Sequence, residues 1–397
     1  MIVGVGRAGK SSGRGPAAGD DAADVVALVD DLLARAVEAG ASDVHFEPTA
    51  RGLTVKFRLD GALSVFEELP RAVADGVVAR LKVLGGLLTY RNDVPQEGRL
   101  DRPGGADVLE KRLAVFPTIH GERAVVRIFY AERELTDLDA LGLPGHILAA
   151  LKRIASAGEG VVLLTGPAGS GKSTTLAALL RHILARWPGR SIVTLEDPVE
   201  RHVEGATQVQ IPPRGEMTFP LALRSLLRQD PEVLMIGEIR DAETARIAVE
   251  AGLTGHLLLS TMHSGAPAGA LLRLLEMGVE PYQVTSSIRA VVNQRLLRRL
   301  CRHCRRTGPG GRRRPVGCEA CLGTGYRGRT LIAEMVELDG RLRKAVLAKA
   351  DLETLTEMLA RRGHMDLRAA GMALVADGTT AVEEVRRLCG PGPEGED

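Results

Sequence analysis

The feature that most constrains the fold is segment 161–186, in which a glycine-rich loop lies between an apolar run and a helical pattern. The loop, GPAGSGKS at residues 166–173, satisfies the phosphate-binding pattern of Gly, any four residues, then Gly-Lys-Ser. The run VVLLT before it is typical of a strand buried on both faces. After the loop, apolar residues recur at helical spacing until Gly189. This order directs the free N–H groups of a helix N-terminus at a phosphate.

A second match to the pattern, GVGRAGKS at residues 4–11, lacks that context. Only three residues precede it, which is too few for a core strand, and the Gly- and Ser-rich stretch after it is broken by Pro16. We therefore expect residues 1–20 to form a flexible tail and Lys10 not to bind nucleotide.

The working loop predicts a complete nucleotide site. Lys172 is expected to contact the β- and γ-phosphates of ATP, and Ser173 to coordinate Mg²⁺. Backbone N–H groups of the loop would surround the phosphates. The residues predicted to bind ATP and Mg²⁺ are Gly166, Gly169, Ser170, Gly171, Lys172, Ser173 and Thr174.

Short apolar runs alternate with helical stretches downstream. Residues 192–195, 233–236 and 257–260 are expected to be strands, and 241–252 a helix with Asp241 as its cap and Gly252 at its end. Such alternation favours an α/β fold, with a parallel sheet between two layers of helices.

Polar residues follow three of these strands, at the sheet edge where chemistry gathers in such folds. Glu196 follows the first within TLEDPVE, Glu238 the second and His263 the third. Glu238 is placed to hold Mg²⁺ through water, Glu196 to orient and deprotonate the attacking water, and His263 to sense the γ-phosphate. The alternatives are a helix-capping carboxylate and a structural histidine.

The amino-terminal part predicts a separate α+β domain. Residues 22–39 have one apolar face, and 53–59 alternate between apolar and polar residues up to a tight Asp60-Gly61 hairpin. Further strands are expected at 111–116 and 123–130.

Four cysteines, Cys301, Cys304, Cys318 and Cys321, form two Cys-x2-Cys pairs separated by thirteen residues. Two such pairs can close a tetrahedral thiolate site, which predicts structural Zn²⁺; free buried thiols or a redox pair are the alternatives. Cys389 stands apart and is expected to be inert. Beyond the cysteines, 331–388 is expected to be mostly helical, with a capped helix start at Thr379-Thr380 before Glu383.

Composition excludes several classes of protein. A net charge of +2 gives no general electrostatic attraction for nucleic acid. Because only 3% of the residues are aromatic, few side chains are available on which nucleic-acid bases could stack. The arginines at 305–306 and 312–314 are expected to be solvated or to meet acidic groups of a membrane partner. No signal peptide or bilayer-length apolar run is found, so a cytoplasmic location without a transmembrane segment is expected.

The chain resembles the secretion ATPases of type II secretion and type IV pilus assembly over residues 22–388. The resemblance rests on GPAGSGKSTTL, TLEDPVE, LLRQDPEVLMIGEIRDAETARIAVEAGLTGHLLLSTMHS and NQRLLRRLC, and on ASDVHFEP, RLDG, PQEGR and IHGER in the amino-terminal part. GCEACLGTGYRGR matches the tetracysteine element of the assembly members, which retraction relatives lack. The match departs at His263-Ser264-Gly265, where the family has His-Thr-Asn-Asp, and at Arg112-Leu113-Ala114, where it has Arg-Val-Ser.

The resemblance implies a RecA-like ATPase core at 134–300, after a PAS-like domain at 21–133 and before a zinc element at 301–328 and a helical subdomain at 329–397. It implies catalytic roles for Lys172, Glu196, Glu238 and His263, and for Arg99 and Arg112 as phosphate-binding arginines of the amino-terminal domain.

It further implies a homohexameric ring that powers pilus or pseudopilus assembly from the inner membrane, bound there through a platform protein. The extra amino-terminal domain of many relatives is not recognisable, so docking is expected to use another surface. Alternatives are a retraction-type ATPase, a nucleic-acid motor and a non-hydrolysing scaffold.

Overall fold

The computed structural model describes residues 18–100, 107–130, 137–212 and 215–391. The chain divides into two compact units, residues 1–132 and 133–397. Each unit has its own apolar core.

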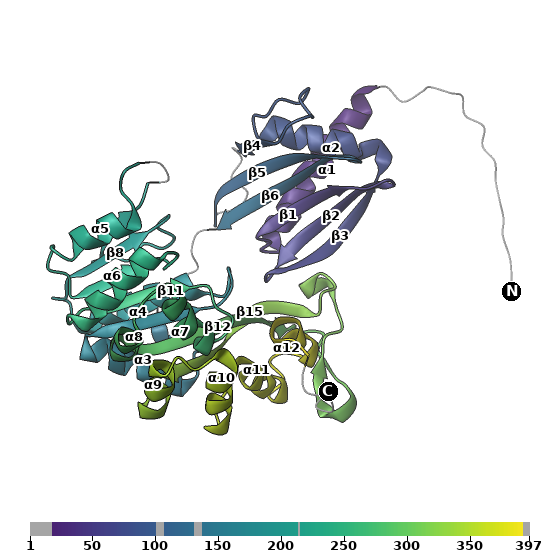
Figure 1. Cartoon of the computed structure of the whole chain (residues 1–397). Coiled ribbons are helices and arrows are strands. Elements are labelled where there is room, and N and C mark those ends of the chain that lie inside the picture. The colour runs from purple at the N-terminus through teal and green to yellow at the C-terminus, as the bar shows by residue number, and fades with distance from the viewer. Residues whose placement is uncertain (1–17, 101–106, 131–136, 213–214, 392–397) are drawn as a thin grey trace, which may run out of the picture. The chain divides into compact units, whose positions relative to one another are not determined.

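In its described part, the first unit holds a six-stranded antiparallel sheet, with strands in the order β3-β2-β1-β6-β5-β4 (Figure 1). Side chains of α1 and α2 pack on one face, over alternate residues such as Val44, Phe46 and Phe57. Asp60 and Gly61 both have positive φ in the β2–β3 turn, as expected for the hairpin. The elements of this unit are α1 (Ala18–Glu38), β1 (Asp43–Pro48), β2 (Gly52–Leu59), β3 (Ala62–Pro70), α2 (Arg71–Leu84), β4 (Gln96–Arg99), β5 (Val108–Thr118) and β6 (Gly121–Tyr130).

The second unit is built on a seven-stranded sheet in the order β15-β12-β7-β11-β10-β8-β9. All neighbouring strands are parallel except β15, which runs antiparallel to β12 at one edge. The parallel sheet expected from the alternating pattern is therefore confirmed. Its strands are β7 (Gly160–Thr165), β8 (Ile192–Glu196), β9 (Thr207–Gln210), β10 (Val233–Ile236), β11 (Leu257–Met262), β12 (Ile288–Leu300) and β15 (Tyr326–Glu337).

Helices cover both faces of this sheet. Side chains of α3 and α4 pack with one set of alternating strand residues, including Val162 and Leu164, and helices α5 to α10 pack with the other set, including Val161 and Leu163. The helices are α3 (Gly145–Ala157), α4 (Lys172–Arg186), α5 (Phe219–Leu226), α6 (Ala242–Leu253), α7 (Pro267–Glu276), α8 (Pro281–Ser287), α9 (Gly340–Leu347), α10 (Leu352–Arg361), α11 (Leu367–Ala376) and α12 (Val382–Cys389). None of the described helices is long and apolar enough to cross a bilayer.

Local expectations hold with three corrections. Asp241 caps α6 as predicted, but Gly252 lies inside that helix, which continues to Leu253, and packing accounts for the glycine, since a Cβ there would come within 2.4 Å of Val161. Residues 331–337 are strand rather than helix, because they pair with β12 as part of β15. The predicted cap at Thr379-Thr380 is wrong: Ala381 precedes α12, and the Thr380 hydroxyl donates to the Arg298 carbonyl instead.

Candidate nucleotide and metal sites

The glycine loop joins β7 to α4, which begins at Lys172. Gly169 and Gly171 have φ of 74° and 91°, a region that glycine adopts without strain. Gly166 must also be glycine, because a Cβ there would lie 2.5 Å from the Gln294 carbonyl oxygen. The Lys172 ammonium donates to the carbonyls of Gly166 and Pro167, at 2.9 and 3.0 Å, within the loop.

A cavity of about 540 Å³ opens beside this loop, and we call it the phosphate-loop cavity. Its size suits a nucleotide, since ligand sites span roughly 300–1,000 Å³. It brings together the residues predicted from three separate strand ends, while Gly166 and Ser170 lie outside its lining and Ser170 is buried. The predicted residues that line it are Gly169, Gly171, Lys172, Ser173, Thr174, Glu196, Glu238 and His263.

Glu238 lies between the side chains of His263 and Arg240. Its Oε1 is 3.0 Å from Nε2 of His263, and its Oε2 accepts a hydrogen bond of 2.8 Å from Nε of Arg240. Arg240 is exposed, and its guanidinium also lies 4.0 Å from Asp197. Sequence reasoning assigned no role to Arg240.

Glu196 is held differently, with 7% of its surface exposed. Its Oε1 accepts hydrogen bonds from the Thr194 hydroxyl at 2.6 Å and the Gln208 amide at 3.0 Å. Gln208 is fixed in turn, because its amide also donates to the Arg201 carbonyl and its oxygen accepts from Val203 N. A carboxylate oriented this firmly in a polar cavity can act as a base toward a bound water.

Burial lowers the pKa of Lys172, although the nearby carboxylates of Glu238 and Glu200 raise it in part. A half-buried ammonium of this kind gains most from a partner with several negative charges. The Lys172 end of the cavity therefore favours an anionic ligand over a neutral one.

Two residues of β12 support the loops around the cavity, and sequence reasoning gave them no role. The Gln294 amide donates to the Ser170 carbonyl at 3.0 Å, which braces the glycine loop. The Asn293 amide donates to the Gly265 carbonyl at 2.8 Å and to Glu334 at 2.7 Å. Glu334 also lies 3.0 Å from Nε2 of His364, so buried polar groups link the His263 loop to the α10–α11 connection.

Arg99 and Arg112 belong to the first unit, whereas the phosphate-loop cavity is lined wholly by residues of the second. They face each other across the β4–β5 pairing, and both are exposed. Their Nε atoms share Oε1 of Glu110, at 2.8 and 2.9 Å. The other phosphate-loop match, residues 4–11, lies outside the described residues.

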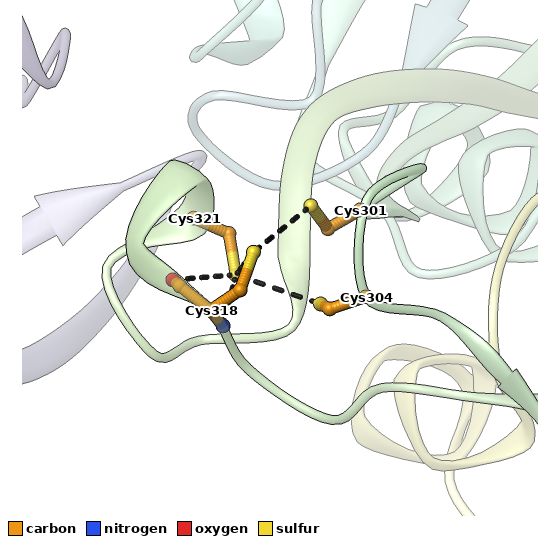
Figure 2. A group of neighbouring side chains, drawn as sticks. All are labelled: Cys301, Cys304, Cys318 and Cys321. Carbon is orange, nitrogen blue, oxygen red and sulfur yellow. Dashed lines mark hydrogen bonds between the residues drawn. The ribbon is translucent and has the colours of Figure 1, made fainter.

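The four clustered cysteines converge on one point from two facing turns (Figure 2). Their sulfur atoms all lie within 4.8 Å of one another, and the closest pairs are 3.7, 3.8 and 3.9 Å apart. A tetrahedral site with zinc–sulfur distances of about 2.3 Å has edges of about 3.8 Å, so the spacing fits Zn²⁺.

Backbone amides favour the thiolate form of Cys321, whereas burial raises the pKa of the neighbouring Cys318 thiol to about 11. Burial opposes ionisation of Cys321, but N–H groups of Cys318 and Gly325 donate to its sulfur and lower its pKa to about 7. Cys389 lies elsewhere, half-buried among apolar side chains of α11 and α12, where burial raises the pKa of its thiol.

The family model described as "Type II/IV secretion system protein" matches residues 18–387. The chain belongs to this family. The match covers both units and every residue discussed above except the residue 4–11 loop and Cys389.

Several secretion proteins are similar to this family member. It is 42% identical over 368 residues to the type II secretion system protein HxcR of Pseudomonas aeruginosa, covering 93% of this chain and 78% of that one. It is 39% identical to the type IV pilus assembly ATPase PilB of Thermus thermophilus, covering 90% of this chain but only 42% of the relative.

Two solved structures share the fold of this chain. The Legionella pneumophila ATPase DotB superposes with a TM-score of 0.65 at 22% identity, covering 91% of this chain and 95% of that one. The pilus retraction motor PilT with bound ADP gives a TM-score of 0.58 at 23% identity, covering 92% and 97%. The RecA-like α/β fold expected from the resemblance is therefore confirmed.

Proposed function

We propose that this family member is a Mg²⁺-dependent ATPase that powers assembly of a pilus or pseudopilus. The observation that carries the proposal is the convergence of Lys172, Glu196 and Glu238 on one cavity at the carboxyl ends of parallel strands. The relatives named for type II secretion and for pilus assembly support a role in assembly rather than in retraction.

The loop and the first turn of α4 bind the triphosphate of ATP. The loop N–H groups and Lys172 meet the β- and γ-phosphates, while the Ser173 hydroxyl, and Glu238 through water, hold the metal. Mg²⁺ supplies charge neutralisation between the phosphates when it is bound.

Glu196 orients the attacking water and accepts its proton. The hydrogen bonds from Thr194 and Gln208 occupy Oε1, so Oε2 is the oxygen that serves as the base. His263, held against Glu238, senses whether the γ-phosphate is present. Arg99 and Arg112 assist hydrolysis by adding positive charge at the phosphates. They come from the first unit of the same or a neighbouring chain.

The motor works as a homohexameric ring, and closure of one subunit moves the next. It acts at the cytoplasmic side of the inner membrane, where it binds a platform protein rather than lipid hydrocarbon. The cysteine cluster holds Zn²⁺ as a structural ion, since four thiolates leave no open coordination position.

The test is ATP turnover by purified protein with Glu196→Gln beside Glu200→Gln, which removes a carboxylate from the same cavity. We expect Glu196→Gln to bind Mg²⁺·ATP but to hydrolyse it at least about a hundredfold more slowly than wild type, whereas Glu200→Gln should keep most of the wild-type activity. A wild-type protein that binds ATP without turnover would indicate the non-hydrolysing scaffold instead. For the motor role, Glu196→Gln expressed in the host should abolish assembly of surface pili or export of secreted protein.

A further inference from the structure

The second unit has another cavity, of about 350 Å³, which we call the arginine cavity. Arg299 and Leu300 line it from the end of β12, Arg302 and Arg305 from the first cysteine turn, and Thr379 from the turn after α11. It shares no lining residue with the phosphate-loop cavity.

Hydrogen bonds fix the three segments that form this cavity. Leu300 N donates to the Thr379 carbonyl at 2.8 Å, and the Arg305 guanidinium donates to the Gly378 carbonyl at 3.0 Å. The stem of Arg313 packs on the same turn, since a Cβ at Gly378 would lie 3.1 Å from it. The arginine cavity is therefore assembled by tertiary contacts.

The charges in the arginine cavity are unbalanced. No carboxylate lines it, and the side chains of Arg299 and Arg302 have no ion pair or hydrogen bond among the described residues. Asp377, on the adjacent turn, is exposed and accepts from Thr379 N, again without an ion pair in that part of the chain. Arg298 next door shows the contrasting case, because its guanidinium is paired with the buried Glu384.

The sequence concentrates positive charge at this place. Residues 281–318 contain ten arginines and no Asp, Glu or Lys, so the rest of the chain holds 42 basic against 50 acidic residues. A net charge of +2 for the whole chain is thus the sum of one strongly basic segment and an acidic remainder. Four thiolates around one Zn²⁺ would carry a net charge of −2, which offsets only two of the positive charges of this segment.

Three arginines line this cavity and no carboxylate does, so their like charges repel one another, and an anion with several charged oxygens relieves that repulsion. The planar fork of an arginine side chain matches the spacing of oxygens in a phosphate group. We propose that the arginine cavity binds a phosphate group, carried by a soluble phosphate compound or by the headgroup of an anionic lipid.

Pyrophosphate binding, measured by calorimetry, tests the proposal. All proteins carry Lys172→Ala, so that the phosphate-loop cavity contributes little. The pocket variant is Arg299→Gln with Arg302→Gln, and its control is Arg306→Gln with Arg312→Gln, which removes the same charge from exposed positions outside the cavity. The pocket variant should bind pyrophosphate at least about tenfold more weakly than the parent, and the control within about threefold.

Flotation with vesicles of neutral phosphatidylcholine, with and without phosphatidylglycerol, separates the two sources. Loss of pyrophosphate binding and of charge-dependent flotation in the pocket variant supports a lipid headgroup, and loss of pyrophosphate binding alone supports a soluble phosphate. Equal behaviour of the pocket variant and its control, or a parent that binds neither probe, would overturn the proposal. Arg302→Glu, a single change at an exposed side chain, repeats the test if the double variant folds poorly.

Discussion

Nε2 of His263 lies 3.0 Å from Oε1 of Glu238, across the ends of two neighbouring parallel strands. β10 and β11 run side by side: Ile236, the last residue of β10, pairs with Ser260, and β11 continues to Met262, so the segments that follow the two strands start close together. The Thr261 hydroxyl donates to the Gly237 carbonyl at 2.7 Å and keeps these two strand ends in register. In the proposed function, this contact is the route by which a change at the γ-phosphate would pass from Glu238 to the segment that follows His263.

Replacing His263 should lower ATP turnover more than ATP binding. In His263→Ala, Glu238 keeps its hydrogen bond to Arg240 but loses the imidazole, so we expect kcat to fall roughly tenfold to a hundredfold with little change in Kd. His146→Ala, at an exposed position at the start of α3, is the control. Steady-state kinetics with a separate binding titration checks the result, and an unchanged kcat would remove His263 from the mechanism.

Gln208 should act as a positioning residue for Glu196. Gln208→Leu removes the amide donor to Oε1 of Glu196 but leaves the carboxylate in place, so we expect kcat to fall about tenfold while KM stays within about twofold. Gln208→Glu should not restore activity, because it supplies no donor in its ionised form. Gln210→Leu on the same strand is the control, because the Gln210 side-chain oxygen accepts from Val199 N and only its backbone pairs with Glu196, so it should turn over ATP at the wild-type rate. A rise in KM with normal kcat would contradict the positioning role.

Each chain should hold one zinc ion, measured by atomic emission on the purified protein. Cys301→Ser should lose the ion and lower the midpoint of thermal unfolding, because the ion closes the loop between the two cysteine turns. Cys389→Ser, which changes a thiol remote from the cluster, should retain one equivalent. Zinc retained at wild-type stoichiometry in Cys301→Ser would refute the four-thiolate site.

Glu384 should make the stability of the second unit depend on acid pH. Burial of this carboxyl would raise its pKa, but hydrogen bonds from Arg387 and Arg298 outweigh burial and lower it. Its contribution is therefore complete above the unfolded pKa of about 4.3, and is lost as pH falls through the lower folded value.

In Glu384→Gln the two arginines lose their buried partner, which should cost about 3 kcal/mol or more of the free energy of unfolding at pH 7. The difference from wild type should shrink as pH falls below about 4.3. Denaturant titrations at several pH values measure this, with the exposed Glu357→Gln as control. A difference that stays constant down to pH 3 would contradict the assignment.

The sequence predicted those parts of the second unit that local pattern determines. A continuous apolar run, a glycine loop and a helical repeat were enough to locate β7 and α4, and polar residues after strands located Glu196, Glu238 and His263 at one edge. The parallel order of the strands then brought these residues together, as the alternation implied.

Contacts between distant segments could not be predicted in the same way. Gln208 supports Glu196 from an edge strand of four residues, and Asn293 supports the His263 loop from β12, although neither has a local signal. The pattern predicted Thr380 as part of a helix cap, but its hydroxyl donates a hydrogen bond to the carbonyl of Arg298, which lies 82 positions earlier in the chain. Competition of this kind between local and long-range hydrogen bonds is decided by the folded structure.

The most direct test of the central claim is nucleotide binding by two lysine variants of the two phosphate-loop matches. A fluorescent ATP analogue is titrated, in the presence of Mg²⁺, into Lys172→Ala and into Lys10→Ala. The first variant tests the loop between β7 and α4, and the second tests the loop at residues 4–11. We expect Lys172→Ala to bind at least about tenfold more weakly than wild type, which is about 1.4 kcal/mol, and Lys10→Ala to bind as wild type does. Normal binding by Lys172→Ala, or an equal loss in both variants, would contradict the account.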